Sequence, residues 1–370
     1  MKFNLEKAVL IGAIAAASRA VTTRSSIPSL EGLLITAENG AVTLTGYNLA
    51  TGIRATVEAD VAKEGSAVIN ARLFGDIIRK MPDDMVTVSV AEDLTATIDC
   101  GMSHFNLLAL PRADFPELPA VERDRTMTLP QATIKSMIGM TIFAVSDNEN
   151  KPVHTGSLFD VKDGTLTVVS VDGYRMAIRR ESVEATGDSF SFVVPGNALR
   201  EVERLSADSD EPITLVLGRR HLIFEIGAVT LVSRLLEGEF LNYENAVPKD
   251  ASVIVTADTR QIADAVERVS LVINERLKNP IRCHFEGGLM KLSCVTTLGR
   301  ASDEVMLEGD RGEVEIGFNN RYLLDAVRAV PDERVKIELK TGLTPCIFRP
   351  LEGDAYLFMV LPVRLKNNEE

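Results

Sequence analysis

The sequence predicts an α+β protein of three similar domains, each with two helices packed against antiparallel sheets. Three observations predict this fold. Helix-then-strand segments recur about every 125 residues, an amphipathic helix opens each repeat, and a strand hairpin follows each opening helix. A chain of 370 residues also exceeds the size at which one hydrophobic core stops growing. We therefore expect domains at residues 1–125, 126–250 and 251–370.

The opening helices are predicted from apolar residues that recur at helical spacing. Their segments are LEKAVLIGAIAAASRAV from Leu5, LPQATIKSMIGMTIFAVS from Leu129 and DTRQIADAVERVSLVIN from Asp258. Pro130 fits the first turn of the second of these helices, because a residue there needs no backbone N–H donor. Each domain is therefore expected to begin with a helix.

Paired strands are predicted after each opening helix. The segments are GLLITAENGAVTLTGYN, GSLFDVKDGTLTVVSVDG and IRCHFEGGLMKLSCVTT, with turns at Asn39-Gly40, Asp163-Gly164 and Gly287-Gly288. These dipeptides favour two-residue hairpin turns, because both of their residues tolerate positive φ. Three matched hairpins at matched places support an internal repeat.

A second helix and a strand close each repeat. The segments are NARLFGDIIRKMPDDMVTVSV, PGNALREVERLSADSDEPITLVL and NNRYLLDAVRAVPDERVKIEL. An Asn stands near each helix start, where its side chain can accept a hydrogen bond from a free backbone N–H. The strands are expected to end at Val90, Leu217 and Leu339.

Composition predicts a globular, cytoplasmic protein without a membrane segment. The apolar run after Lys7 lacks the basic n-region and cleavage site of a signal peptide, and it is too short to span a bilayer. The four cysteines have no metal-ligand spacing, so we expect buried free thiols at Cys100, Cys283, Cys294 and Cys346.

Charge is unevenly distributed along the sequence. A formal net charge of −13 argues against nucleic-acid binding by the surface as a whole, because binding requires local positive charge. The second helices nevertheless carry arginines seven or four residues apart, which keeps each pair on one helix face: Arg72 and Arg79, Arg200 and Arg204, Arg321 and Arg328. An ordinary solvated helix face is the alternative, and only the threefold recurrence favours phosphate binding.

Catalytic and cofactor motifs are not found in the sequence. It contains no phosphate-binding glycine loop, no nucleophile elbow and no metal-binding His-Glu-x-x-His. The Asp-Gly of VDGYRMA is expected to form a turn. We expect no catalysis, no cofactor and no metal, and partly buried structural roles for His104, His154, His221 and His284.

Three segments together resemble one family, the bacterial β sliding clamp, which is the processivity subunit of DNA polymerase III. They are VSVDGYRMAIRR from Val169, SRLLEGEFLNYENAVP from Ser233 and MVLPVRL from Met359. The resemblance covers the whole chain, including YNLATGIRA from Tyr47 and ALPRADFPELP from Ala109.

The resemblance implies a head-to-tail homodimer whose clamp domains close into a ring around double-stranded DNA, with helices lining the hole. Such a ring binds DNA without sequence specificity and slides, because no base is read. The implied partners are DNA polymerase III, the clamp loader and other clamp-binding-motif proteins, which dock short peptides between the second and third domains. Two alternatives remain open: a repeated-domain protein-interaction scaffold that does not bind DNA, and an enzyme with a dispersed site.

The resemblance also implies site residues. DNA contacts are expected at Arg24, Arg72, Asn148 and Arg200, followed by Arg79, Arg204 and Arg328. The peptide pocket is expected to comprise His154, Gly173, Tyr174, Arg175, Met176, Leu241, Val247, Tyr322, Leu343, Pro345, Met359, Leu361, Pro362, Val363 and Arg364. The chain departs from the family pattern at His154, Tyr174, Leu241, Asn245 and Ala246, at Gly196 to Ala198, and in the tail from Lys366 to Glu370, so the peptide preference stays open.

Overall fold

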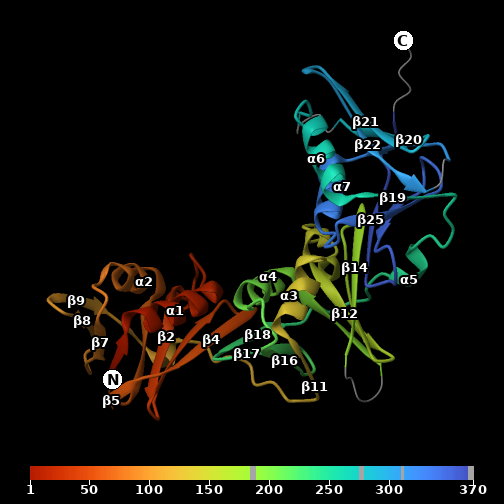
Figure 1. Ribbon diagram of the computed structural model, residues 1–370. Coiled ribbons are helices and arrows are strands. Elements are labelled where there is room, and N and C mark those ends of the chain that lie inside the picture. Colours follow the sequence, from red (N-terminus) through yellow and green to blue (C-terminus); the bar gives the residue numbers. More distant parts are fainter. Residues whose placement is uncertain (184–188, 275–278, 310–311, 366–370) are drawn as a thin grey trace. The chain divides into compact units, whose positions relative to one another are not determined.

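The chain folds into two compact units (Figure 1). The first unit comprises residues 1–135 and 201–235, and the second comprises residues 136–200 and the described chain from Leu236 onward. This computed structural model describes residues 1–183, 189–274, 279–309 and 312–365. The tail noted from Lys366 to Glu370 lies outside the described residues.

The first unit contains two antiparallel sheets, ordered β5-β1-β7-β8-β9 and β10-β6-β2-β3-β4-β18-β17-β16-β11. Helices α1 (Lys7–Ala17) and α2 (Ala71–Lys80) pack against each other in this unit. The strands are β1 Lys2–Glu6, β2 Gly32–Glu38, β3 Ala41–Tyr47, β4 Thr51–Glu58, β5 Asp60–Lys63, β6 Gly65–Asn70, β7 Met85–Val90, β8 Thr95–Cys100, β9 Ser103–Leu108, β10 Leu110–Pro111, β11 Arg125–Pro130, β16 Pro212–Leu217, β17 His221–Ile226 and β18 Val229–Arg234.

The second unit also contains two antiparallel sheets, ordered β15-β12-β13-β14-β27-β26-β25-β19-β23 and β22-β21-β20-β24. Helices α6 (Thr259–Ser270) and α7 (Asn320–Arg328) pack together here, and the short helix α5 spans Tyr243–Ala246. The strands are β12 Gly156–Lys162, β13 Thr165–Val171, β14 Arg175–Ser182, β15 Phe190–Pro195, β19 Val253–Asp258, β20 Ile281–Glu286, β21 Leu289–Thr296, β22 Gly299–Met306, β23 Glu308–Gly309, β24 Val314–Phe318, β25 Arg334–Leu339, β26 Cys346–Arg349 and β27 Tyr356–Val360.

Two sheets join one domain to the next. Strand β4 pairs antiparallel with β18, and β14 pairs in the same way with β27. In both cases the third strand after an opening helix meets the third strand after the second helix of the following domain. Helices α3 (Gln131–Gly139) and α4 (Gly196–Leu205) complete the count of two long helices per domain. The predicted α+β repeat with antiparallel sheets is confirmed.

The three hairpin turns have the predicted backbone. The residue pairs Asn39-Gly40 and Asp163-Gly164 both have φ values of 51° and 74°, and Gly287-Gly288 has 60° and 86°. Positive φ at both central residues matches the right-handed twist of the flanking strands. The turn chemistry therefore fixes three hairpins at equivalent places in the repeat.

Side-chain caps set the starts of three of the repeated helices, α2, α6 and α7. Asn70 Oδ1 accepts a hydrogen bond from the Leu73 N–H at 3.0 Å, and Asn319 caps α7 in the same way. Asp258 Oδ1 accepts from the Gln261 N–H at 2.8 Å at the start of α6. The strands after the second helices end where predicted, at the last residues of β7, β16 and β25.

The prediction that each domain begins with a helix is wrong. A short strand precedes each opening helix, namely β1, β11 and β19. Pro130 accordingly ends β11 and does not lie in the first turn of α3, which begins at Gln131. Phe3 and Leu5, which are both buried, alternate with more exposed residues, and this period-2 pattern is typical of a strand.

Large apolar side chains fill the space between the sheets and helices. Phe3 and Phe74 are fully buried in the first unit, as are Phe318 and Phe358 in the second. Burial of each contributes roughly 1.5–3 kcal/mol to folding. None of the helices formed by the described residues is both long and apolar enough to cross a membrane.

The four cysteines are buried free thiols, as predicted. Burial raises the pKa of Cys283 to about 12 and raises the pKa of Cys346 well above its usual range. These thiols are therefore not ionised at neutral pH and act as small apolar core residues.

Candidate nucleic-acid interface and peptide pocket

The predicted shared face of Arg72 and Arg79 is present on α2. Asp76 lies between them: its carboxylate is 3.9 Å from Arg72 Nε and forms an ion pair with Arg79. The Arg72 side chain is 93% exposed. Exposed ion pairs are weak, so a phosphate can replace Asp76 as the partner of either guanidinium.

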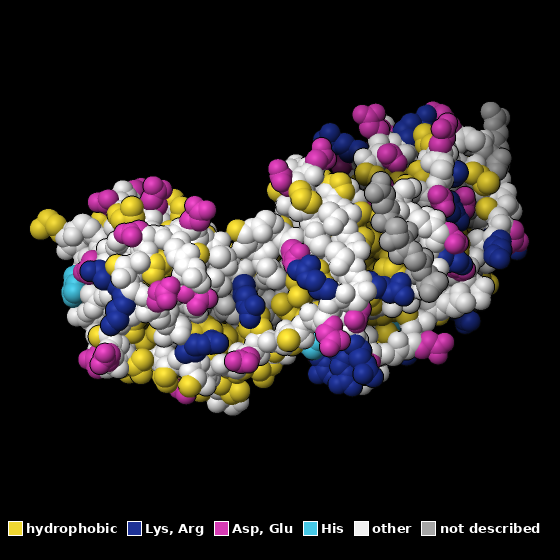
Figure 2. All heavy atoms as spheres, turned by 90° about the horizontal axis from the view of Figure 1, so that it is seen from below, with side chains coloured by type: hydrophobic (Ala, Val, Ile, Leu, Met, Phe, Trp, Pro, Cys, Tyr) yellow, Lys and Arg dark blue, Asp and Glu magenta, His cyan; other side chains and the backbone are white. Residues whose placement is uncertain are grey.

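The other predicted DNA-contact residues lie at exposed or half-buried positions. Arg24 is exposed and forms no ion pair with any of the described residues. Arg204 pairs with Glu201 at 2.6 Å, and Arg328 pairs with Glu267 at 2.6 Å. In Figure 2, Lys and Arg side chains are interspersed with Asp and Glu side chains on the visible surface of each unit.

Among the described residues, Arg200 and Asn148 form hydrogen bonds with near neighbours in the sequence. Arg200 Nη1 donates to Asn197 Oδ1 at 3.1 Å. Asn148 is exposed in the loop before β12, and its side-chain oxygen accepts a hydrogen bond from the Asn150 N–H at 3.0 Å. Both side chains stay proposed DNA contacts.

The predicted turn at Asp172-Gly173 positions the next two residues of the second unit. Asp172 Oδ1 accepts hydrogen bonds from the backbone N–H groups of Tyr174 and Arg175, at 2.9 and 3.0 Å. Gly173 has a φ of 91°, which a residue with a side chain rarely adopts. The backbone oxygen of Tyr174 then accepts from the Leu361 N–H at 2.9 Å, so the turn is held against the end of β27.

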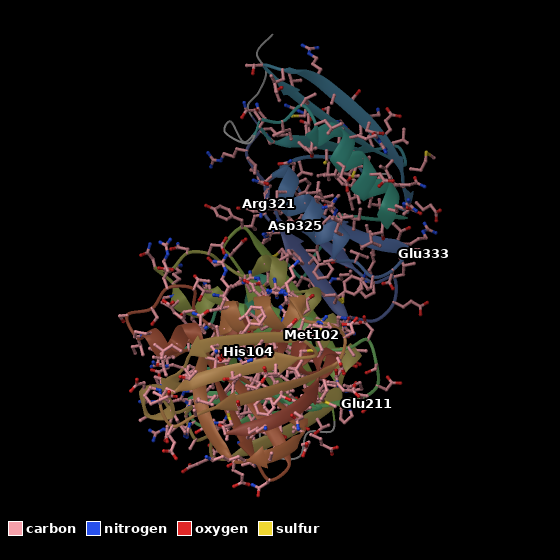
Figure 3. The ribbon with its side chains drawn as sticks, turned by 90° about the vertical axis from the view of Figure 1, so that its left-hand side faces the viewer. Met102, His104, Glu211, Arg321, Asp325 and Glu333 are labelled. Atoms are coloured by element: carbon pink, nitrogen blue, oxygen red, sulfur yellow. The ribbon has the colours of Figure 1, made fainter. Side chains whose placement is uncertain are left out.

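Arg175 is buried and links β14 to α7. Its Nε donates to Asp172 Oδ2 at 2.9 Å, and its Nη1 donates to Asp325 Oδ2 at 2.6 Å. The guanidinium also lies 4.5 Å from the ring centroid of Tyr322 and 5.3 Å from that of Phe143, which are cation–π distances. Asp325 follows Arg321 along α7 (Figure 3).

An aromatic wall stands beside this arginine. The rings of Tyr174 and Tyr322 stack with centroids 5.7 Å apart and an angle of 23° between their planes. Burial raises the pKa of Tyr322, and the nearby Asp172 carboxylate adds to this effect. Tyr174 is 60% exposed, so the stack presents an open apolar surface to a ligand.

The chain beyond β27 continues this surface. Met359 lies opposite Met176 in the sheet, and β27 ends at Val360, before Pro362. Pro362 follows the strand end, where its missing N–H costs no ladder hydrogen bond. The Val363 N–H donates to the Gly317 oxygen at 2.8 Å, which fixes the last predicted pocket residues against β24.

His154 and its neighbours form a second edge of the candidate pocket. The His154 ring packs edge-on against Phe240 with centroids 5.3 Å apart. Burial lowers the pKa of His154, and the positive charge of Lys151 lowers it further. Phe240 and Val247 pack against the same buried cluster as Met176 and Met359.

The structure brings together most of the predicted pocket residues within the second unit. Direct contacts connect Tyr174, Arg175, Tyr322 and Leu361, and one apolar cluster connects Met176, Met359 and Val247. Leu343 is 77% exposed and Leu241 is 42% exposed, in loops without a described contact to that cluster. These residues form an apolar surface beside the buried, ion-paired guanidinium of Arg175.

The whole chain is similar to known proteins of one family. Models of the DNA polymerase III beta subunit match the chain as N-terminal domain at residues 1–119, central domain at 128–242 and C-terminal domain at 244–364. The chain belongs to the DNA polymerase III beta subunit family. The domain boundaries at residues 125 and 250 stay predictions.

Several members of this family are similar to the chain over nearly its whole length. The beta sliding clamp of Halalkalibacterium halodurans is 32% identical, over 98% of this chain and 100% of that protein. The DNA polymerase sliding clamp structure from Bacillus subtilis has a TM-score of 0.96 and 26% identity, covering 99% of this chain and all of that one. The DNA polymerase III subunit beta from Pseudomonas aeruginosa has a TM-score of 0.94 and 28% identity, with the same coverage.

The sequence did not indicate three residues that contact the predicted pocket residues, namely Asp325, Phe143 and Phe240. Asp325 on α7 accepts a hydrogen bond from Arg175, and no pattern in the sequence indicated this pair. Phe143 and Phe240 lie against Arg175 and His154.

Two histidines have carboxylate neighbours that the sequence did not indicate. His104 is exposed, contrary to the prediction, and its Nδ1 lies 2.5 Å from Asp99. His284 Nε2 lies 3.2 Å from Glu313 and 3.8 Å from Glu286. The ammonium of Lys291 is 3.3 Å from the same Glu286 carboxylate, so a protein cation already neutralises part of this cluster.

Proposed function

We propose that this chain is a DNA sliding clamp that encircles duplex DNA and tethers the replicative polymerase and other DNA-processing proteins. The single observation that supports a ring is that two strands, β9 and β22, each have one edge without a neighbouring strand among the described residues. Strand β9 is the last strand of its sheet in the first unit, and β22 is the last strand of its sheet in the second.

These two edges are equivalent to the strands that already join the domains. Strand β22 is the third strand after an opening helix, like β4 and β14. Strand β9 is the third strand after a second helix, like β18 and β27. The repeat therefore supports β22 of one copy pairing with β9 of another, and two such joins close a head-to-tail homodimer.

The side chains at these edges favour burial in an interface. Phe105 is 40% exposed and Leu108 is 80% exposed on β9, and Met102, which precedes the strand, is fully exposed (Figure 3). Around β22, Leu298 and Met306 are each 69% exposed. An exposed strand edge with apolar side chains is a template for pairing with another chain.

The basic helix faces support the contact with DNA. Arg24, Arg72, Arg79, Asn148, Arg200, Arg204 and Arg328 are the proposed contacts, and they are exposed or half-buried. Mobile guanidiniums that exchange carboxylate partners for phosphates hold a duplex without reading its bases. Such weak contacts let a ring slide.

The pocket of the second unit is the proposed docking site for DNA polymerase III, the clamp loader and other proteins with a clamp-binding peptide. The apolar surface around Tyr174, Met176, Tyr322 and Met359 suits Leu and Phe side chains, and buried Arg175 fixes its shape. A tether needs no chemistry of its own, so we propose that the protein is not an enzyme. We propose that it acts on DNA in the bacterial cytoplasm.

Retention on circular DNA tests the ring. The purified protein is loaded onto nicked circular DNA with the clamp loader of the same organism, and the complex is isolated by gel filtration. We expect the protein to remain on the circle and to be lost when a restriction enzyme linearises the DNA. Equal retention on linear DNA would contradict encirclement, and no retention in either form would favour the repeated-domain scaffold.

A further inference from the structure

We infer that a charged cavity beside the peptide pocket forms a second subsite, which binds acidic residues flanking the Leu/Phe segment of a partner peptide. This inference rests on the proposed peptide pocket. The cavity has a volume of about 400 Å³, and it is lined by Ile178, Arg180, Tyr243, Glu244, Val247, Pro248, Lys249, Glu338, Arg349 and Leu357.

The strand register makes the cavity continuous with the pocket. Met176 lies opposite Met359, and two residues further along the strands Ile178 lies opposite Leu357. Residues two apart on a strand share one face of the sheet. The face therefore runs from the apolar pocket at Met176, through Ile178, to Arg180.

On the neighbouring strand β26, the side chains on this face also change from apolar to charged along the strand. On β26, Ile347 lies opposite Met359, and Arg349 is two residues beyond it on the same face. Arg349 Nε donates to Glu338 Oε2 at 3.0 Å, with both side chains about one-fifth exposed. Arg349 is therefore already neutralised, and its pair with Glu338 forms a fixed wall.

Tyr243 holds the outer wall in place. Its hydroxyl donates to Asp160 Oδ2 at 2.8 Å, which anchors helix α5 over the sheet. Burial and this hydrogen bond raise the pKa of Tyr243, so it stays a neutral donor across the physiological range. The residues that follow α5, Pro248 and Lys249, are thereby held at the cavity rim.

The remaining charges give the cavity a positive balance. Three cations and two carboxylates line it, and one cation and one carboxylate are the Arg349–Glu338 pair. Within the lining, Arg180 and Lys249 are then opposed only by Glu244. Outside the lining, the exposed Asp354 carboxylate lies 3.9 Å from Arg180 Nη1, and an exposed ion pair of this kind is weak enough for a peptide carboxylate to replace it. Arg180 Nη1 donates to the backbone oxygen of Asp354 at 2.9 Å, and Lys249 forms no ion pair with any described residue. An anionic side chain is the complementary occupant.

Flanked peptides test the subsite. The probes are fluorescein-labelled peptides carrying the Leu/Phe segment of the same organism's polymerase III catalytic subunit, with three Glu, three Ala or three Lys added at either end. At about 50 mM salt, we expect Glu at one end to tighten binding about three- to tenfold over Ala, and Lys at that end to weaken it.

Two variants that change the charge of the cavity in opposite directions test whether the tighter binding of the Glu-flanked peptide arises there. Lys249→Ala removes the advantage of the Glu-flanked peptide and leaves the affinity of the Ala-flanked peptide unchanged, whereas Glu244→Gln increases that advantage. Lys162→Ala, at an exposed lysine at the end of β12, is the matched control and changes neither. Equal affinity of Glu- and Ala-flanked peptides at both ends overturns the subsite alone. Failure of all the peptides to bind overturns the peptide pocket, and the subsite with it.

Discussion

Arg175 Nη1 donates a 2.6 Å hydrogen bond to Asp325 Oδ2, joining a strand of the central domain to a helix of the C-terminal domain. The Arg175 side chain is 8% exposed and that of Asp325 is 27% exposed. A charge-assisted pair that is this well shielded from water is stronger than a surface ion pair. It fixes Arg175 beside Tyr322 and thereby sets the shape of the proposed peptide pocket.

Asp325→Asn is expected to weaken the pocket and the fold together. The change leaves Arg175 with Asp172 as its only carboxylate, so the buried guanidinium is less well compensated. We expect a loss of about 1–3 kcal/mol in the free energy of unfolding and weaker binding of a Leu/Phe peptide. Urea unfolding and fluorescence anisotropy measure the two effects.

Asp76→Asn is the matched control for this change, because Asp76 forms exposed ion pairs on α2. It should alter stability by less than about 0.5 kcal/mol and leave peptide affinity unchanged. Equal effects of the two variants would show that the Arg175–Asp325 pair has no special role.

Arg24→Ala combined with Arg72→Ala is expected to weaken DNA binding and flatten its salt dependence. Each lost phosphate contact lowers the slope of log affinity against log salt by about one. Fluorescence anisotropy of labelled duplex at several salt concentrations measures this slope. The peptide affinity should not change, and an unchanged slope would contradict the assignment of these two arginines.

Leu108→Asp is expected to break the homodimer into monomers. Leu108 is 80% exposed at the free edge strand β9, and a carboxylate there cannot be buried in a paired interface without a partner. Analytical ultracentrifugation gives the mass. Leu351→Asp, at a leucine that is 44% exposed away from both free edges, is the control and should stay dimeric. A monomeric wild-type protein would contradict the ring itself.

The sequence predicted the fold well wherever local chemistry decides it. The Asn39-Gly40 and Asp163-Gly164 turns, the Asn70 cap and the end of β7 are each set by a few neighbouring residues. The opening strands were missed because β1 is only five residues long and runs directly into a helix.

The candidate site was less predictable because its contacts join distant parts of the chain. Arg175 and Asp325 are 150 residues apart, and no spacing rule connects them. Deleting Met359 to Leu365 would not test the pocket alone. Because β27 pairs with β14 on one side and β26 on the other, that deletion removes part of a central strand, and truncation after Leu361 is the cleaner change.

Peptide affinity is expected to fall as pH decreases through the lowered pKa of His154, which lies below the usual histidine value of about 6.5. Burial, and then Lys151, lower the pKa of His154 in the folded protein, so its imidazole is neutral at pH 7. The stability that this neutral ring contributes is present above the unfolded pKa and is lost as pH falls toward the lowered folded value. A bound peptide buries the ring further, so protonation opposes binding once the pH falls below the lowered folded pKa.

His154→Leu separates this effect from other titrations, because leucine fills the same apolar edge beside Phe240 and has no proton to gain. Anisotropy titrations between about pH 8 and about pH 5.5 should show affinity falling for the wild-type protein and nearly constant for the variant. His221→Leu is the control: its pKa is also lowered by burial, but it lies on β17 in the first unit, outside the pocket. If the His154→Leu protein keeps the full pH dependence, another group in the peptide or the pocket controls binding, and His154 does not face the ligand.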